Sequence, residues 1–154
     1  MVRAQFEPWV PFPLEQVFLF FANPHNLPRI MPPASDTRIE GLKLVEPASL
    51  QDSIERQATR LVAGPKAQLM TSFRILPPLP FRAQWVAQIT EFEWNRYFAD
   101  IQATGPFKSW HHRHEFESAI RDGITAQWCA TKSGTMSGWV FWVSSRRRCL
   151  SEAR

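Results

Sequence analysis

The N-terminal part of the chain changes from strand-like to helix-like spacing of its hydrophobic residues. Along Val2–Val10 hydrophobic and polar residues alternate, and this alternation predicts a strand. From Leu14 onward the hydrophobic residues recur at the spacing of one helix face. They are Leu14, Val17, Phe18 and Phe21. The Asn-Pro pair at 23–24 ends this helix because the residue before proline avoids helical backbone angles. A second short helix is predicted over 26–30, before the two prolines at 32–33.

The rest of the body consists of short segments that are typical of strands. They are Asp36–Leu44, Ala67–Ile75, Phe81–Glu91, Tyr97–Ala103 and Phe107–Glu117. Each is bounded by proline, glycine or polar turns, and consecutive strands of this kind pair as an antiparallel meander. One strand, two short helices and a run of strands indicate an α+β domain. The sheet must bury one face, so we expect a further covering element at the C-terminus.

Size and hydropathy are those of one globular domain. The chain has 154 residues, of which 44% are hydrophobic and 21% charged. No segment approaches the roughly 20 apolar residues of a membrane span, so no integral membrane segment is expected. The first residues show no basic region followed by an apolar stretch, which predicts no secretory signal and a cytoplasmic location.

Charge and cysteine are concentrated at the C-terminus. Residues 125–154 contain five basic residues and one acidic residue, whereas residues 1–124 contain 13 of each. A neutral body lacks the basic surface of a nucleic-acid-binding protein, so nucleic acid is excluded as a partner. Cys129 and Cys149 both lie in the basic tail. The body therefore has neither a disulfide framework nor cysteine-based metal spacing.

The candidate chemistry lies between Tyr97 and Phe116. Alternate side chains of a strand share a face. On the first predicted strand one face carries Phe98, Asp100 and Gln102. On the next strand one face carries Trp110, His112, His114 and Phe116, after a turn at Gly105-Pro106. If both faces point inward, four polar groups lie among aromatic rings, which is the usual composition of a small-molecule pocket.

Three stretches of the sequence resemble the SRPBCC superfamily, which includes START lipid-transfer domains, plant allergens and polyketide cyclases. They are VPFPLEQVFLFFANPHNLPRIMPP, LPPLPFRAQWVAQITEFEWNRYF and the FxDxQxxGPFxxWxHxHxF run that begins at Phe98. They cover most of residues 1–120, and the last is similar to a bacterial cyclase/dehydrase-like subgroup. The resemblance implies a helix-grip fold, in which a curved antiparallel sheet wraps a long C-terminal helix with a cavity between them.

This resemblance and the face pattern together predict binding or transport of a hydrophobic small molecule, such as a lipid, a polyketide or an isoprenoid-like compound. The residues expected to line its site are Trp85, Phe98, Asp100, Gln102, Phe107, Trp110, His112, His114 and Phe116. One alternative is an enzyme of the polyketide cyclase or dehydratase kind, and another is an accessory interaction domain without a ligand. No cofactor is expected, and the oligomeric state is left open.

Asp100, His112 and His114 permit more than one chemistry. Two histidines and a carboxylate on one face could ligate a metal ion. They could instead form a buried hydrogen-bonded network, which is the interpretation we favour, so no metal is predicted. Asp100 and His112 are also candidates for an acid–base pair, with His114 as a third candidate. A buried aspartate needs a cation to remain charged, and Arg82 or Arg96 is the expected partner.

The last thirty residues depart from the pattern of the superfamily. We therefore divide the chain into a START-like domain at 1–124 and an aberrant or poorly ordered tail at 125–154, with the long helix missing or distorted. In the next reading frame, the codons of Trp139-Val140 and of Trp142-Val143 must each give glycine. The same frame can encode DEVRY, a glycine turn and an apolar segment, as the superfamily expects. A one-base frameshift near 124–128 is our hypothesis, and a diverged or appended tail is the alternative.

Overall fold

A computed structural model describes residues 2–6, 9–47, 61–76, 79–121 and 124–136 of the chain. The helical elements are α1 (Leu14–Ala22), η1 (Pro24–Asn26), α2 (Leu27–Ile30) and η2 (Pro33–Ser35). The strands are β1 (Val2–Phe6), β2 (Trp9–Val10), β3 (Arg38–Lys43), β4 (Gln68–Arg74), β5 (Arg82–Glu93), β6 (Tyr97–Thr104), β7 (His111–Arg121) and β8 (Ile124–Met136). No helix within these ranges is long and apolar enough to cross a lipid bilayer.

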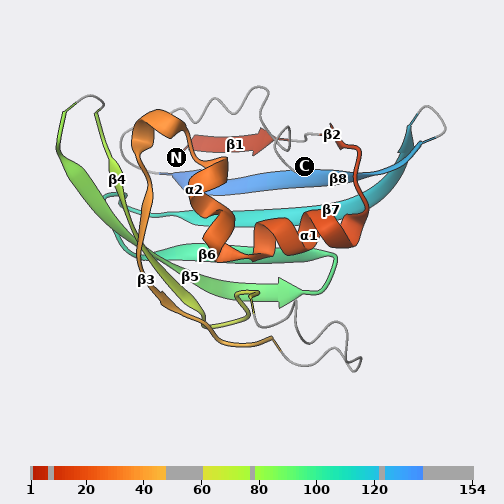
Figure 1. The fold of residues 1–154 in the computed structure, drawn as a ribbon, viewed down its shortest axis with the longest axis horizontal. Coiled ribbons are helices and arrows are strands. Elements are labelled where there is room, and N and C mark those ends of the chain that lie inside the picture. The colour runs from red at the N-terminus through yellow and green to blue at the C-terminus, as the bar shows by residue number, and fades with distance from the viewer. Residues whose placement is uncertain (1, 7–8, 48–60, 77–78, 122–123, 137–154) are drawn as a thin grey trace.

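All described strands belong to one antiparallel sheet (Figure 1). Its order is β1-β8-β7-β6-β5-β4-β3, and β2 pairs with β8 beside β1. The strands from β3 to β8 are thus neighbours in space in the order of the sequence, which confirms the predicted meander. Strand β1 forms the edge opposite β3 and pairs with β8, the last described strand. The N-terminal segment is therefore held by hydrogen bonds to residues distant in sequence rather than by a hairpin.

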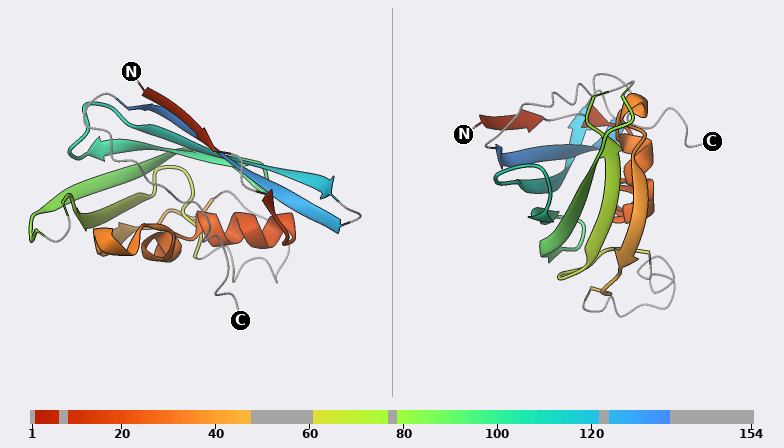
Figure 2. Two further views of the ribbon diagram at one scale, coloured as in Figure 1. Left: turned by 90° about the horizontal axis from the view of Figure 1, so that it is seen from above. Right: turned by 90° about the vertical axis from the view of Figure 1, so that its left-hand side faces the viewer.

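Both α-helices lie on the same side of the sheet, whose strands curl toward them (Figure 2). We call this side the inner face. Phe18 of α1 is fully buried there, and its ring contacts Phe98 and Phe116 at centroid distances of 6.1 and 5.1 Å. The buried residues of this core, which we call the α1 cluster, are Val10, Val17, Phe18, Ala22, Val62, Phe98 and Phe116. The helix-spaced residues of the sequence therefore cover the sheet.

A second group of hydrophobic residues packs farther along the inner face, on β4 and β5. Its buried members are Phe73, Ala83 and Trp85, and Ile75, Ala87, Phe107 and Trp110 pack against them. We call it the Trp85 cluster. Phe73 and Ala83 are direct partners across the two strands. The apolar inner face is thus divided into two parts, only one of which has α1 in its core.

The ends of the predicted elements are mostly correct, with two differences. The predicted strand at 2–10 is described as two strands, β1 and β2. Helix α1 begins at Leu14, as predicted, after Pro13, which has an extended ψ of 139°. β7 begins at His111 rather than at Phe107, because residues 105–110 are used in the connection from β6.

Strand β8 crosses the predicted domain boundary. Residues 124–133 of β8 pair with β7, from Arg121↔Ile124 to His112↔Ser133. The tail thus supplies the last strand of the sheet, although it lacks the DEVRY-like pattern that the superfamily expects. The place where a long C-terminal helix is expected, and most of the segment affected by the frameshift hypothesis, lie at 137–154, outside the described residues. The division at residue 124 remains a prediction.

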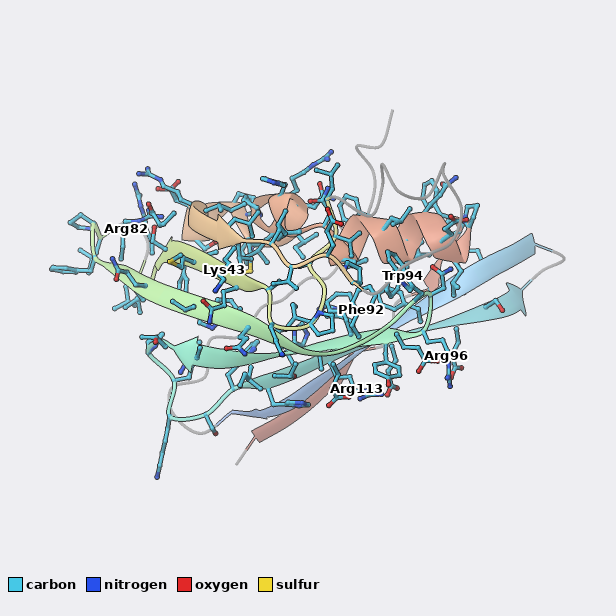
Figure 3. All side chains as sticks on the ribbon, turned by 90° about the horizontal axis from the view of Figure 1, so that it is seen from below. Lys43, Arg82, Phe92, Trp94, Arg96 and Arg113 are labelled. Atoms are coloured by element: carbon cyan, nitrogen blue, oxygen red, sulfur yellow. The ribbon has the colours of Figure 1, made fainter. Side chains whose placement is uncertain are left out.

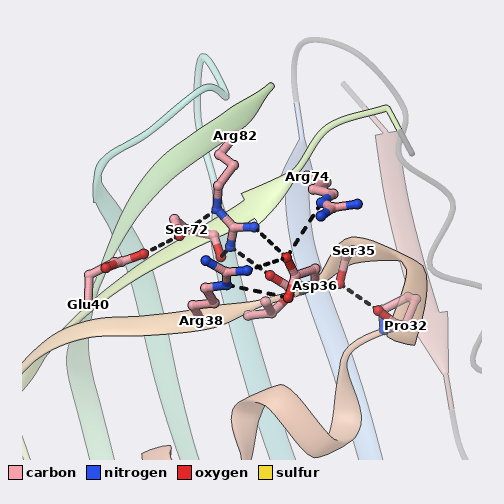
Figure 4. Close-up of polar contacts among 9 residues, drawn as sticks. Pro32, Ser35, Asp36, Arg38, Glu40, Ser72, Arg74 and Arg82 are labelled. Atoms are coloured by element: carbon pink, nitrogen blue, oxygen red, sulfur yellow. Dashed lines mark hydrogen bonds and ion pairs between the residues drawn. The ribbon is translucent and has the colours of Figure 1, made fainter. Parts of the chain in front are cut away.

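An exposed ion-pair cluster joins the start of β3 to β4 and β5 (Figure 4). Asp36 has a left-handed backbone with a φ of 44°, which aspartate tolerates better than most residues. Its carboxylate lies within 2.9 Å of Arg38, 3.4 Å of Arg74 and 2.8 Å of Arg82. The Arg82 guanidinium also donates to the Asp36 and Ser72 backbone carbonyls. These bonds fix the edge of the sheet around the Trp85 cluster.

Candidate functional site

The register between β6 and β7 brings the candidate polar residues together. Asp100 is the direct partner of His112, and Phe98 is the direct partner of His114. All four lie on the inner face, because Phe98 is part of the α1 cluster. Asp100 is 7% exposed and His114 8% exposed, while the His112 side chain is 18% exposed. The inward orientation of these two strand faces was the central geometric expectation from the sequence.

The Asp100 carboxylate has two polar contacts, both with residues of the predicted set. The Trp110 indole Nε1–H donates to Asp100 Oδ1 at 3.2 Å. His112 Nδ1 lies 3.3 Å from Asp100 Oδ2, within reach of a hydrogen bond or an ion pair. The two carboxylate oxygens therefore have different partners. This arrangement orients the carboxylate and holds the rings of Trp110 and His112 on either side of it.

The cation expected beside Asp100 is not an arginine. Arg82 is engaged with Asp36, and Arg96 pairs with Glu93 at 2.5 Å. Within the described ranges, no lysine or arginine forms an ion pair with Asp100; its one charged partner is His112, when protonated. The sequence interpretation was wrong on this point because Arg82 is held at the sheet edge by Asp36, 46 residues away in the chain, and Arg96 is held by Glu93 in the β5–β6 turn. The partners of the Asp100 carboxylate are therefore the imidazole of His112 and the indole N–H of Trp110.

His114 is enclosed by rings. Its imidazole lies 4.5 Å from the Phe98 ring, 5.6 Å from the Phe21 ring and 4.1 Å from the His112 ring, between centroids. Burial, reinforced by repulsion from His112, holds the pKa of His114 well below its usual range of about 6.5. The imidazole is therefore neutral at neutral pH, so one of its two ring nitrogens carries no proton.

Together these three side chains form a compact group of possible ligand atoms. One atom each from Asp100, His112 and His114 can be chosen so that all lie within 4.8 Å of one another. The group sits where the α1 cluster meets the Trp85 cluster: His114 contacts Phe98 of the first, and His112 lies 5.7 Å from Trp110 of the second. Polar groups thus mark the boundary between two apolar regions.

Gln102 has a structural task in the β6–β7 connection. Its Nε2 donates to the Phe107 carbonyl at 2.6 Å, and its Oε1 accepts from the Phe107 backbone N–H at 3.2 Å. A Cβ atom at position 105 would collide with the Gln102 side chain where it now lies, so a larger residue there would displace the amide from this contact. Gln102 shares the inner face with Asp100, as predicted, but its amide is used to position Phe107.

The predicted aromatic residues separate into two groups. Phe98 and Phe116 are core residues beneath α1. Trp85, Phe107 and Trp110 form a second group, with Trp110 5.4 Å from the Trp85 ring and 5.5 Å from the Phe107 ring. Phe21, which packs against the α1 cluster, and Phe73, a buried member of the Trp85 cluster, were not predicted as site residues. The sequence held an indication for each of them. Phe21 is on the apolar side of α1, and Phe73 lies on a strand-like segment, where it faces Ala83 across β4 and β5.

Neighbouring residues on β7 point to the opposite, outer face of the sheet. Arg113 pairs there with Glu91 and Glu115, and its guanidinium lies 3.9 Å from the centre of the Tyr97 ring. Figure 3 shows Arg113 and Arg96 on the side away from the helices, and Phe92 and Trp94 toward them. His111 is 43% exposed. The alternation predicted for this strand is confirmed on both faces.

The fold is similar to several solved structures at low sequence identity. A START superfamily protein from Mycobacterium smegmatis matches with a TM-score of 0.54 and 11% identity, over 91% of this chain and 81% of that one. A point mutant of Thalictrum flavum norcoclaurine synthase, in complex with a transition-state analogue, gives a TM-score of 0.53 and 11% identity over 86% and 73% of the two chains. Ginseng major latex-like protein from Panax ginseng gives 0.51 and 13%, over 86% and 79%.

No family model matches the sequence, and no curated protein matches it. The structural likeness therefore rests on the path of the chain and not on shared residues. The chain has a START-like, helix-grip fold.

Proposed function

We propose that this protein binds a hydrophobic small molecule on its inner face, over the Trp85 cluster, with the polar end of the molecule at Asp100 and His112. A lipid, a polyketide or an isoprenoid-like compound has the required chemistry: a long apolar body and one oxygen-bearing end. The observation that carries the proposal is a largely buried carboxylate and two imidazoles at the edge of an aromatic cluster.

Burial of these polar groups costs free energy that a simple core would avoid. A carboxylate removed from water needs a cation or several hydrogen bonds to remain charged. Asp100 has only indole and imidazole partners within the described residues. Small-molecule sites combine a mostly apolar lining with a few polar groups that fix orientation, and this site has that composition. A hydroxyl or carboxyl group of the ligand would add the missing hydrogen bond.

Trp85 supports the same interpretation. Its indole Nε1 is buried, and no hydrogen-bond partner for it is found among the described residues. An unsatisfied buried donor costs about 1–3 kcal/mol. An acceptor oxygen of a bound molecule would recover that cost. Because Trp85 is a buried member of the second cluster, the missing acceptor lies in the region where we place the ligand.

The aromatic rings supply the apolar contact. Phe107 and Trp110 are stacked, and Trp110 meets Trp85 edge-to-face. Gln102 holds the Phe107 backbone, so the ring of Phe107 is positioned before a ligand arrives, which lowers the entropic cost of binding. Each Å² of apolar ligand surface removed from water would contribute about 25 cal/mol before such ordering costs.

A pair of neighbouring substitutions on β5 tests the location. Ala87 is opposite Gln102 and packs against the Trp85 cluster. Val86, its neighbour on β5, takes the other face of the strand and is opposite Met70, which is exposed. Ala87→Trp should block the proposed ligand surface, and Val86→Trp should leave it free. The probe is a brominated fatty acid, whose bromine atoms quench tryptophan fluorescence on contact.

The expected result is saturable quenching in the parent chain and in Val86→Trp, with loss of saturable quenching in Ala87→Trp. Circular dichroism verifies that both variants fold. Native mass spectrometry of the purified chain should in addition detect a co-purifying apolar molecule. Equal quenching curves for the two variants, or no saturable quenching in the parent chain, would contradict the proposal.

A further inference from the structure

We infer that Asp100, His112 and His114 form a site for one zinc ion. The sequence alone predicts no metal here, since it shows only that the three residues share a face. The structure adds their proximity: one ligand atom from each lies within 4.8 Å of the others. Zinc bonds to nitrogen and oxygen are about 2.0–2.2 Å long, so two ligand atoms of a tetrahedral site lie about 3.3–3.6 Å apart. Zinc binding therefore requires side-chain rotations that bring the three atoms to that separation.

The charge balance of the site favours a bound cation. Asp100 is 7% exposed, and in the described chain no arginine or lysine pairs with it. The imidazoles of His112 and His114 lie beside this carboxylate, with ring centroids 4.1 Å apart. A divalent cation between the three side chains neutralises the carboxylate and uses the electron pairs of both imidazoles.

The donor set is also appropriate for zinc. Two imidazoles and one carboxylate are a common three-residue zinc ligand set, in which the fourth position is held by water or by a substrate. His112 and His114 are two residues apart on β7, so both point to the inner face. Asp100 reaches the same point from β6, as the direct partner of His112. Two adjacent, hydrogen-bonded strands thus fix the ligands on a rigid support.

The surroundings orient these ligands. Trp110 Nε1 donates to Asp100 Oδ1, which leaves Oδ2, the oxygen beside His112, to bind the metal. Phe98 packs against the His114 ring at 4.5 Å and restricts its rotation. Contacts of this kind, one step removed from the metal, hold ligand atoms in place and typically change metal affinity by a factor of about 10–100. Trp110 is therefore a positioning residue of the proposed site.

The zinc site deepens the proposed function without depending on it. When three side chains coordinate zinc, its fourth coordination position stays open. An oxygen at the polar end of the bound hydrophobic molecule can occupy that position. Zinc binding is nevertheless measured without any organic ligand. A failure of the fatty-acid experiment and a failure of the zinc experiment are therefore separate results.

The test uses the full chain with Cys129→Ser and Cys149→Ser as the reference background, so that thiols do not compete for metal. After treatment with a chelator, zinc is added in competition with a chromophoric indicator. We expect one zinc ion per chain. The substitutions Asp100→Asn, His112→Gln and His114→Gln should each weaken binding by more than about 100-fold, and Trp110→Phe by about 10-fold. His111→Gln, an adjacent exposed histidine on the outer face, is the matched control and should bind as the reference does.

A second measurement needs no substitution in the site, in case a variant fails to fold. The chain has four histidines, and nitrogen NMR of their rings distinguishes metal-bound from free imidazole. Zinc should shift the ring nitrogens of His112 and His114 and leave those of His25 and His111 in place. The inference is overturned if the folded reference chain binds no stoichiometric zinc, or if zinc shifts other histidines. It is equally overturned if the three ligand substitutions leave the affinity unchanged, since the group is then a hydrogen-bonded network.

Discussion

Asp100 and His112 face each other across two adjacent strands, with the histidine Nδ1 3.3 Å from the aspartate Oδ2. This pair is the most buried carboxylate–imidazole contact that the structure describes, and Trp110 completes it on the other carboxylate oxygen. Its position between the α1 cluster and the Trp85 cluster connects the core of the fold to the proposed ligand surface. The same residues therefore contribute to the stability of the fold and to the chemistry of the site.

Removal of His112 should destabilise the metal-free protein. In His112→Leu the Asp100 carboxylate stays buried with only the Trp110 N–H, and loss of one partner of a buried pair costs about 3–5 kcal/mol. His111→Leu removes a partly exposed imidazole from the outer face, so its effect should stay within about 0.5 kcal/mol. Urea unfolding in the presence of a chelator measures both. Coincident unfolding curves for the two variants would show that the pair contributes nothing.

Phe18 should be the most sensitive position of the α1 cluster. Its fully buried ring meets Phe92, Trp94, Phe98 and Phe116, so Phe18→Ala leaves a cavity that four other rings cannot easily fill. The expected loss of unfolding free energy is about 3–5 kcal/mol. Phe81 is 67% exposed, and Phe81→Ala should change stability by less than about 0.5 kcal/mol. Denaturant titration compares them; similar losses would contradict the assignment of the core.

The Gln102–Phe107 clamp should depend on glycine at position 105. Gly105→Ala places a methyl group against the Gln102 amide, and Gln102→Ala removes the amide itself. Both substitutions should speed hydrogen exchange at the Phe107 backbone N–H, because that donor loses its acceptor. Thr104→Ala, at an exposed neighbouring position, is the control. Unchanged exchange at Phe107 in both variants would mean that the clamp does not form in solution.

Acid should weaken the Asp36 cluster. The hydrogen bond from Arg38, together with Arg82, lowers the pKa of Asp36 below its usual value of about 3.8. A carboxyl group with a lowered pKa in the folded state stabilises the fold above its unfolded pKa, and the contribution is lost as the pH falls through the lower, folded value. Asp36→Asn should therefore reduce the thermal midpoint near neutral pH and converge with the parent chain in strong acid. The difference should shrink in high salt, because the pair is exposed.

The frameshift hypothesis makes a prediction at the level of DNA. The gene should encode DEVRY, a glycine turn and an apolar segment in the frame that takes the third base of each codon with the first two of the next. Sequencing the region that encodes residues 120–154 decides this directly. If that frame holds stop codons or a polar sequence instead, the tail is a diverged or appended segment.

The sequence by itself determined the local features of this protein. Alternation of residue types placed Asp100, His112 and His114 on one face and Arg113 on the other, because side chains of a strand change face at every residue. Proline and asparagine ended α1 at Ala22 through backbone sterics. The meander followed from short connections between consecutive strands. Each of these inferences depends on residues that are close along the chain.

Only the tertiary structure decided which polar groups meet. Arg82 pairs with Asp36, 46 residues away, and so does not neutralise Asp100, while Gln102 is used by its own turn. Whether α1 covers Phe98 and Phe116 or Trp85 and Trp110 depends on how a helix from one end of the chain docks on strands from the other. Register, docking and side-chain rotamers are set by contacts distant in sequence, and no local pattern encodes them. For this reason a shared face was predictable, but a three-residue site was not.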